Sequence, residues 1–224
     1  LKGQYNHIKE QVNQSVLETI ESTMFINGPK VKSFQDHLEK YLDVKHVIPC
    51  ANGTDALQIA LMGLGLKPGD EVITADFTFA ATVEVISLLG LTPVLVDVDP
   101  KTFNIDLPAI EKVIGPKTKA IIPVHLFGQA AEMEEILALA NKYNLYVVED
   151  NAQSIGANYT FSDGSKKKTG TLGHVGTTSF FPSKNLGAYG DGGAIFTNDD
   201  QLAHTIRGMV NHGMYIRYQH DVVG

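Results

Sequence analysis

The two residues best suited to chemistry are a carboxylate that ends a strand-like segment and a lysine in a glycine-rich turn. Asp150 follows the apolar run 145–149, and Lys184 lies in the run 179–193, which ends in Gly-Asp-Gly-Gly. Pyridoxal phosphate needs both groups from a protein, because an amine forms a Schiff base with its aldehyde and a carboxylate keeps its ring nitrogen protonated. The pair therefore predicts a cofactor-dependent enzyme.

Each of the two residues also has a simpler interpretation. A carboxylate at the end of a buried strand is costly unless it has a partner. Asp150 could find one in a structural salt bridge, or it could cap a following helix. Lys184 could merely be exposed, although its flanks at 180–182 and 187–193 indicate a rigid, close-packed turn.

Ligands of open α/β sheets bind at the carboxyl ends of the strands, so the residues that follow strands are the next candidates. In the run 52–55, Gly53 permits close approach, Thr54 offers a hydroxyl, and the free N–H groups of a helix start suit a phosphate. Ser179 can donate another hydroxyl, and Phe79 could stack on a flat ring. The alternatives are an ordinary N-cap turn at 52–55 and a packed core aromatic at Phe79.

The remaining reactive side chains favour structural roles. His125 ends a strand and is interpreted as a supporting residue, and the single cysteine, Cys50, as a core residue. Residues 162–173 indicate a surface hairpin or loop, in which the lysines at 166–168 are solvated charge. No cluster of His, Cys or acidic residues has metal-ligand spacing, and no G-x-S-x-G element suggests a serine hydrolase, so we expect no metal.

The elements that must position these residues alternate along the chain. The first forty residues read as two amphipathic helices around the Asn-Gly-Pro break at 27–29. Apolar strands are predicted at 45–50, 71–75, 93–97, 120–125, 145–149, 177–181 and 194–197, and helices at 54–64, 79–89, 107–114, 133–143 and 199–210. Strands that are apolar throughout, with helices between them, predict an α/β fold with a mainly parallel seven-stranded sheet covered by helices on both faces.

Composition narrows the class of protein. The chain has 224 residues, of which 43% are hydrophobic, and a formal net charge of −7. That length can bury a sizeable core, and the negative charge argues against general binding to nucleic acid or phospholipid. No apolar run approaches the roughly 20 residues that span a bilayer, and the polar start lacks the apolar core of a signal peptide. We therefore expect a cytoplasmic protein.

Six segments in combination resemble the pyridoxal-phosphate-dependent sugar aminotransferases of the DegT/StrS type, and the resemblance covers essentially the whole chain. They are residues 52–57, 68–73, 77–82, 123–129, 149–154 and 179–193. The resemblance implies a fold-type-I transferase and a homodimer with shared active sites. It also implies that 1–224 is the cofactor-binding large domain with N-terminal helices, without the family's smaller C-terminal domain.

The resemblance assigns a role to each candidate residue. Lys184 is the lysine that carries the cofactor, Asp150 holds the pyridine nitrogen, and Gln153 lies against the ring oxygen side. Phe79 stacks on the ring face, and the residues that bind the phosphate are Gly53, Thr54 and Ser179. Related sugar dehydratases have a histidine where Lys184 stands, so the lysine favours transamination.

The implied reaction moves an amino group from an amino acid, L-glutamate, to a keto group on a nucleotide-linked hexose, for amino-sugar and cell-surface polysaccharide biosynthesis. The context of Lys184 up to 190–193 is more similar to members that aminate C3 than to those that act at C4. Two alternatives stay open. One is a non-catalytic pyridoxal-phosphate-binding regulator, and the other is a dinucleotide-binding oxidoreductase, although no G-x-G-x-x-G follows the first strand.

Overall fold

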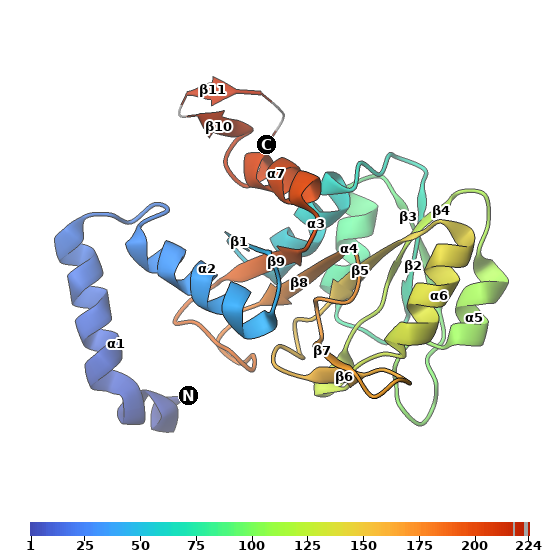
Figure 1. Ribbon diagram of the computed structural model, residues 1–224, viewed down its shortest axis with the longest axis horizontal. Helices are drawn as coiled ribbons and strands as arrows, with labels where there is room; N and C mark the ends of the chain where they lie inside the picture. Colours follow the sequence, from blue (N-terminus) through green and yellow to red (C-terminus); the bar gives the residue numbers. More distant parts are fainter. Residues whose placement is uncertain (217, 222–223) are drawn as a thin grey trace.

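A seven-stranded sheet forms the centre of the computed structural model, which describes residues 1–216, 218–221 and 224 (Figure 1). The strand order is β1-β9-β8-β5-β4-β2-β3, and only β9 runs antiparallel to its neighbours. The strands are β1 (His46–Cys50), β2 (Glu71–Ala75), β3 (Thr92–Val96), β4 (Thr118–Ile122), β5 (Tyr146–Asp150), β8 (Val175–Ser179) and β9 (Gly193–Thr197). The predicted mainly parallel sheet is confirmed.

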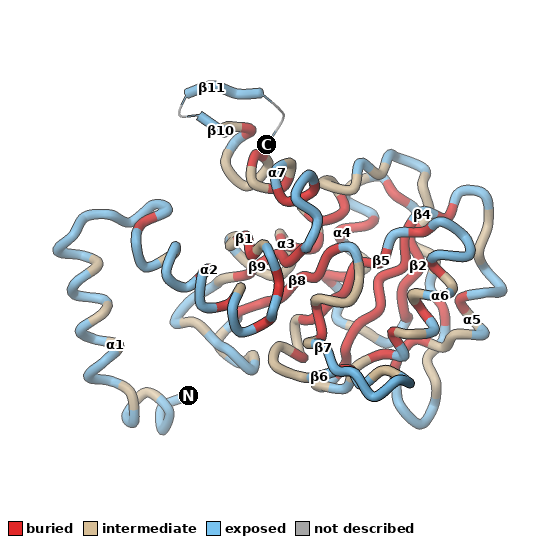
Figure 2. The backbone as a smooth tube through the Cα atoms, in the orientation of Figure 1, coloured by how far each residue is buried: buried red, intermediate tan, exposed pale blue. Residues whose placement is uncertain are grey.

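Helices cover both faces of the sheet because successive residues of its central strands point to opposite sides. Val72 and Val148 pack with residues of α3 (Gly53–Gly63), α4 (Ala80–Leu88) and α7 (Asp200–Met209). Their neighbours Ile73 and Val147 pack with residues of α5 (Leu107–Val113) and α6 (Met133–Tyr143). Buried residues accordingly follow the strands in Figure 2. This two-sided core explains why the strands read as unbroken apolar runs.

Element boundaries differ from the predictions by a few residues. β8 begins and ends two residues before its predicted bounds, so that Ser179 is its last residue and Phe180 and Phe181 lie beyond it. β4 ends at Ile122, and only an isolated bridge between Val124 and Asp150 continues the pairing. A short hairpin of β10 (Met214–Ile216) and β11 (Gln219–His220) was not predicted.

The polar stretch at 162–173 is only partly a surface hairpin. β6 (Asn158–Thr160) pairs with β7 (Lys166–Lys168), and the turn between them is exposed. Lys168 is not simply solvated charge, because its ammonium donates to Gly156 O at 3.1 Å and lies over the Tyr41 ring. Thr169 is fully buried, and the residues after it turn inward, where their N–H groups find a carboxylate. Polar composition here reflects buried hydrogen bonding as well as exposure.

The N-terminal helices have different environments. α2 (Pro29–Leu42) buries Leu38 and Leu42 against the body of the protein, whereas α1 (Lys2–Ser22) buries no residue and projects away from it (Figure 1). Both helices were predicted, but on the apolar side of α1 Val16 and Ile20 are more than half exposed, and Ile8 and Val12 are half-buried. No helix among the described residues is both long and apolar enough to cross a membrane.

Candidate active site

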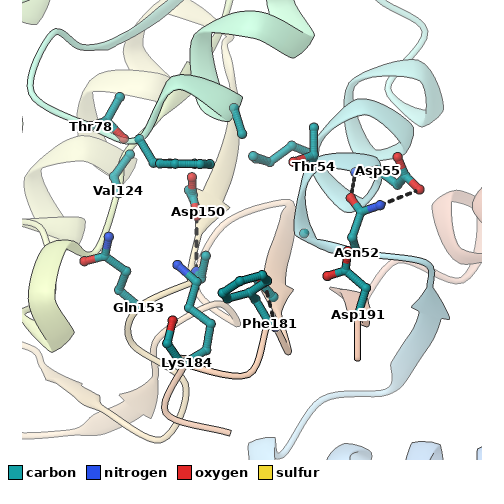
Figure 3. Close-up of a pocket in the computed structure, with 17 residues that line it drawn as sticks. Asn52, Thr54, Asp55, Thr78, Val124, Asp150, Gln153, Phe181, Lys184 and Asp191 are labelled. Atoms are coloured by element: carbon teal, nitrogen blue, oxygen red, sulfur yellow. Dashed lines mark hydrogen bonds between the residues drawn. The ribbon is translucent and has the colours of Figure 1, made fainter. Parts of the chain in front are cut away.

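The predicted site residues all line one cavity of about 620 Å³ (Figure 3). The cavity lies where β1, β2, β4, β5 and β8 end, as expected for the carboxyl edge of a parallel sheet. The predicted residues in its wall are Gly53, Thr54, Phe79, Asp150, Gln153, Ser179 and Lys184. Segments far apart in the sequence therefore meet at one place.

Asp150 is buried, and each of its carboxylate oxygens accepts one hydrogen bond. The Thr82 hydroxyl donates to Oδ2 at 2.8 Å, and the Ala152 N–H donates to Oδ1 at 3.1 Å. Among the described residues, Asp150 forms no salt bridge, and no helix begins directly after it. Neither a structural salt bridge nor a helix cap therefore explains this carboxylate. Its charge is free to pair with a cationic group that enters the cavity.

Lys184 reaches into the same cavity from the segment after β8. Figure 3 shows its amine and the Asp150 carboxylate directed toward a common space. The N–H of Lys184 donates to Phe181 O at 2.8 Å, which forms a tight turn. The flanks are close-packed along the backbone, because Phe180 is buried and a Cβ on Gly187 or Gly193 would collide with a backbone oxygen. The side chains of Phe181 and Tyr189 are nevertheless exposed, so the predicted packing holds only in part.

The start of α3 supplies a capped helix end beside Ser179. The Asn52 carboxamide accepts from the Asp55 N–H at 2.8 Å and donates to the Asp55 carboxylate at 3.0 Å. The first N–H groups of a helix have no intrahelical acceptor, and they suit an anion. A Cβ on Gly53 would lie 2.6 Å from Ser179 Cβ, so this cradle exists only because residue 53 is glycine.

Gln153 is oriented by a bond that the sequence does not reveal. Its Oε1 accepts from the Phe127 N–H at 2.8 Å, so its amide nitrogen is the group left to donate into the cavity. Phe127 has a φ of 55°, which is uncommon for a residue other than glycine. The residue with this unusual backbone conformation is therefore the one whose N–H holds the Gln153 side chain.

Sequence reasoning missed two threonines. Thr82 bonds Asp150 directly, and the Thr78 hydroxyl lies 3.3 Å from that of Thr82. Because the Thr82 hydroxyl donates to the carboxylate, it can accept from Thr78. Thr78 immediately precedes the predicted helix 79–89 and Thr82 lies in its first turn, so their spacing of four residues was the signal that could have found them.

The residues judged structural from the sequence stand apart from this chemistry. His125 is fully buried and outside the cavity wall, and it is bonded to Glu149, which confirms its supporting role. Burial raises the pKa of the Cys50 thiol to about 12, so the thiol is protonated at neutral pH. No group of His, Cys, Asp and Glu in the described part of the chain could hold a metal ion.

A mainly parallel sheet between helices, with an amine and a buried carboxylate facing one cavity at its carboxyl edge, is typical of a cofactor-binding α/β protein. The chain belongs to the DegT/DnrJ/EryC1/StrS aminotransferase family, whose model matches residues 6–224. This family depends on pyridoxal phosphate, and solved structures similar to this chain hold that cofactor or its amino form.

Two curated proteins and one solved structure illustrate the similarity. UDP-2-acetamido-2-deoxy-3-oxo-D-glucuronate aminotransferase of Pseudomonas aeruginosa is 50% identical over 100% of this chain and 61% of its own length. The pleiotropic regulatory protein of Geobacillus stearothermophilus is also 50% identical, over 100% of this chain and 59% of its own. The structure of a DegT DnrJ EryC1 StrS aminotransferase from Brucella abortus has a TM-score of 0.94 and 44% identity, over 99% of this chain and 60% of that one. The chain thus spans about three fifths of the length of these proteins.

Proposed function

We propose that this chain is the cofactor-binding part of an aminotransferase that moves an amino group from L-glutamate to the 3-keto group of a nucleotide-linked hexose. The observation that carries the proposal is the Lys184 amine facing the buried Asp150 carboxylate across one cavity. The similar protein of Pseudomonas aeruginosa, which is named for a UDP-linked 3-oxo sugar, supports the C3 position. The biosynthesis of amino sugars for cell-surface polysaccharide is the corresponding role.

Two features of the cavity itself fit pyridoxal phosphate. Asp150 offers a negative charge with no cationic partner among the described residues, and the cradle at Gly53 would be filled by any Cβ. When bound, the cofactor supplies an aldehyde for Schiff-base chemistry and a ring that takes up electrons. We assign the phosphate to Gly53, Thr54 and Ser179.

The other residues of the wall hold and orient the reactants in this proposal. The Asp150 carboxylate holds the proton of the ring nitrogen, the Gln153 amide donates to the ring oxygen, and the Phe79 ring covers one face. The Lys184 amine would take the proton from the α-carbon of the amino-acid donor as general base and then, as general acid, deliver it to the C4′ carbon of the cofactor.

We propose a homodimer with shared active sites, in which a second chain completes the substrate pocket. Phe79 and Phe181 line the cavity yet are more than half exposed, and so is Tyr189 beyond it. Val16 and Ile20 on the apolar side of α1 are also more than half exposed. A second copy that covers these surfaces would exclude water from the reaction.

Transamination by the full-length protein tests the proposal. With pyridoxal phosphate and L-glutamate we expect 2-oxoglutarate, and with a UDP-linked 3-keto-hexose as acceptor we expect the 3-amino sugar. Borohydride reduction followed by peptide mass mapping should place the cofactor on Lys184. Lys184→Ala should abolish the 2-oxoglutarate, the 3-amino sugar and the trapped cofactor. Lys112→Ala, which removes an exposed lysine of α5, should leave all three intact.

A regulator without catalysis is the second candidate, favoured by the name of the Geobacillus stearothermophilus relative. It predicts cofactor on Lys184 but no 2-oxoglutarate when glutamate is titrated. Trapping of the cofactor on a different lysine would contradict both candidates. The dinucleotide-binding alternative has no support, since the chain belongs to a family that uses pyridoxal phosphate.

A further inference from the structure

A fully buried hydrogen-bonded cluster lies behind the cavity, and no residue of it lines the cavity. Glu149 and His125 both have no exposed surface, and His125 Nε2 lies 2.8 Å from Glu149 Oε2. We propose that Glu149 and His125 are positioning residues that fix Asp150 at the end of β5 and tie β5 to the entry of β8. The inference rests on the proposed function only insofar as Asp150 serves the cofactor.

The Glu149 carboxylate has a donor for each of its four lone pairs. Oε2 accepts from His125 Nε2 and from the Gly170 N–H at 2.7 Å, and Oε1 accepts from the N–H groups of Leu172 and Gly173, each at 2.6 Å. A buried carboxylate is tolerated when it is saturated in this way. Glu149 therefore fastens β5 to the segment that leads into β8, the strand that delivers Ser179.

The bonds of His125 define which of its nitrogens donates. The Ala131 N–H donates to Nδ1 at 3.1 Å, so Nδ1 is an acceptor and the proton is assigned to Nε2, which donates to Glu149. The backbone N–H of His125 also donates to Asp150 O at 3.0 Å. One residue thus holds two consecutive residues of β5.

Asp150 is consequently held through its main chain on the side of β4. Its N–H donates to Pro123 O at 2.9 Å and its carbonyl accepts from His125, while the Thr177 hydroxyl of β8 donates to the carbonyl of Glu149 at 3.1 Å. Misplacement of a catalytic group by about 1 Å can cost on the order of a hundredfold in rate. A cluster that fixes this peptide therefore acts on catalysis through Asp150.

The cluster is specific for a carboxylate at position 149. A glutamine has nearly the same shape, but its NH₂ group replaces one oxygen and would face two N–H donors in either orientation. Two of the four hydrogen bonds must then be lost. Glu149→Gln is therefore a small change in volume and a large change in hydrogen bonding.

The first test compares Glu149→Gln with a core variant of equal stability in the full-length holoenzyme. The control is Ile110→Val or Ile110→Ala, whichever matches the loss of Tm, because Ile110 is fully buried on α5 away from the cavity. We expect Glu149→Gln to slow the half-reaction with glutamate by about tenfold to a hundredfold relative to that control. Equal rates in the two variants at equal Tm would overturn the inference.

The second test separates the two nitrogens of His125 and serves also where Glu149→Gln does not fold. His125→Gln retains an N–H donor near the position of Nε2, whereas His125→Asn retains only an acceptor near that of Nδ1. We expect the glutamine variant to keep the faster half-reaction. Equal rates, or a faster asparagine variant, would contradict the assigned role of Nε2.

Amide hydrogen exchange on the cofactor-free protein distinguishes this inference from the proposed function. In Glu149→Gln the N–H groups of Asp150, Leu172 and Gly173 should exchange faster than in the Ile110 control. Unchanged exchange would overturn the positioning role even in an active enzyme. Absence of transamination in the unaltered protein would instead refute the proposed function and leave the exchange result to decide the role of Glu149.

Discussion

At the scale of single residues, the site depends on a carboxylate that is held without being neutralised. Thr82 and the Ala152 N–H each donate one hydrogen bond to Asp150, and neither donor carries a charge. A hydrogen bond from an uncharged donor to a charged group contributes about 1.5–3 kcal/mol, so the two donors fix the side chain in place. The unpaired charge is then available to a ring nitrogen.

Asp150→Asn should therefore damage catalysis more than folding. Asparagine nearly preserves the volume, and the Thr82 hydroxyl can turn to accept from its amide, but the negative charge is lost. We expect bound cofactor, a small change in Tm and a half-reaction at least a hundredfold slower. Thr82→Val, which removes only the hydroxyl, should give a milder loss of about tenfold. Stopped-flow absorbance with glutamate measures both, and normal turnover in Asp150→Asn would reduce this carboxylate to a structural residue.

At the scale of elements, the phosphate end of the cavity depends on how closely α3 approaches β8. The approach is permitted by Gly53, whose position leaves no room for a Cβ beside Ser179. Ser179 is buried in the last position of a strand that is buried along its whole length, so its backbone has little freedom to move. Helix and strand therefore form one rigid wall.

Gly53→Ala should push this wall apart. The new methyl group would lie 2.6 Å from Ser179 Cβ, and overpacking of this kind costs about 1–3 kcal/mol. We expect a lower Tm and a weaker Kd for pyridoxal phosphate. The control is Gly3→Ala in α1, where nothing lies within 4 Å and alanine favours the helix. A Gly53→Ala protein with unchanged cofactor affinity would mean that the phosphate is bound elsewhere.

The sequence predicted elements better than the contacts between them. Apolar runs identified the seven strands of the sheet, and the residues that follow them supplied the predicted residues of the cavity wall except Ser179, which lies inside the predicted strand 177–181. The prediction placed β8 two residues too late because it included the aromatic residues Phe180 and Phe181, which lie beyond the strand, and left out Val175 and Gly176. Some hydrogen bonds join segments that are distant in the sequence, and no local sequence pattern predicts them. Examples are those of Gln153 to Phe127 and of Glu149 to 170–173.

At the scale of the whole molecule, the described chain leaves apolar surface uncovered in two places. One is the rim of the cavity at Phe79 and Phe181, and the other is α1 with the turn after it, where Ile26 is 87% exposed. α1 stands away from the body in Figure 1 and is mostly exposed in Figure 2. Uncovered apolar faces of this kind are typical of protein interfaces. A second copy is the occupant that the shared-site proposal requires.

Ile20→Asp in the full-length protein should convert a dimer into monomers. A charge on the apolar side of α1, in its last turn, would have to be buried in the dimer without a partner, which strongly disfavours association. Gln11→Asp is the control, because nine residues at 100° each place it on the opposite side of the helix, where the same charge stays in water. Sedimentation equilibrium should show monomers only for Ile20→Asp, together with a loss of sugar amination, since each cavity would remain open at Phe79 and Phe181. A monomeric unaltered protein with full activity, or an Ile20→Asp dimer, would show that α1 does not form the interface.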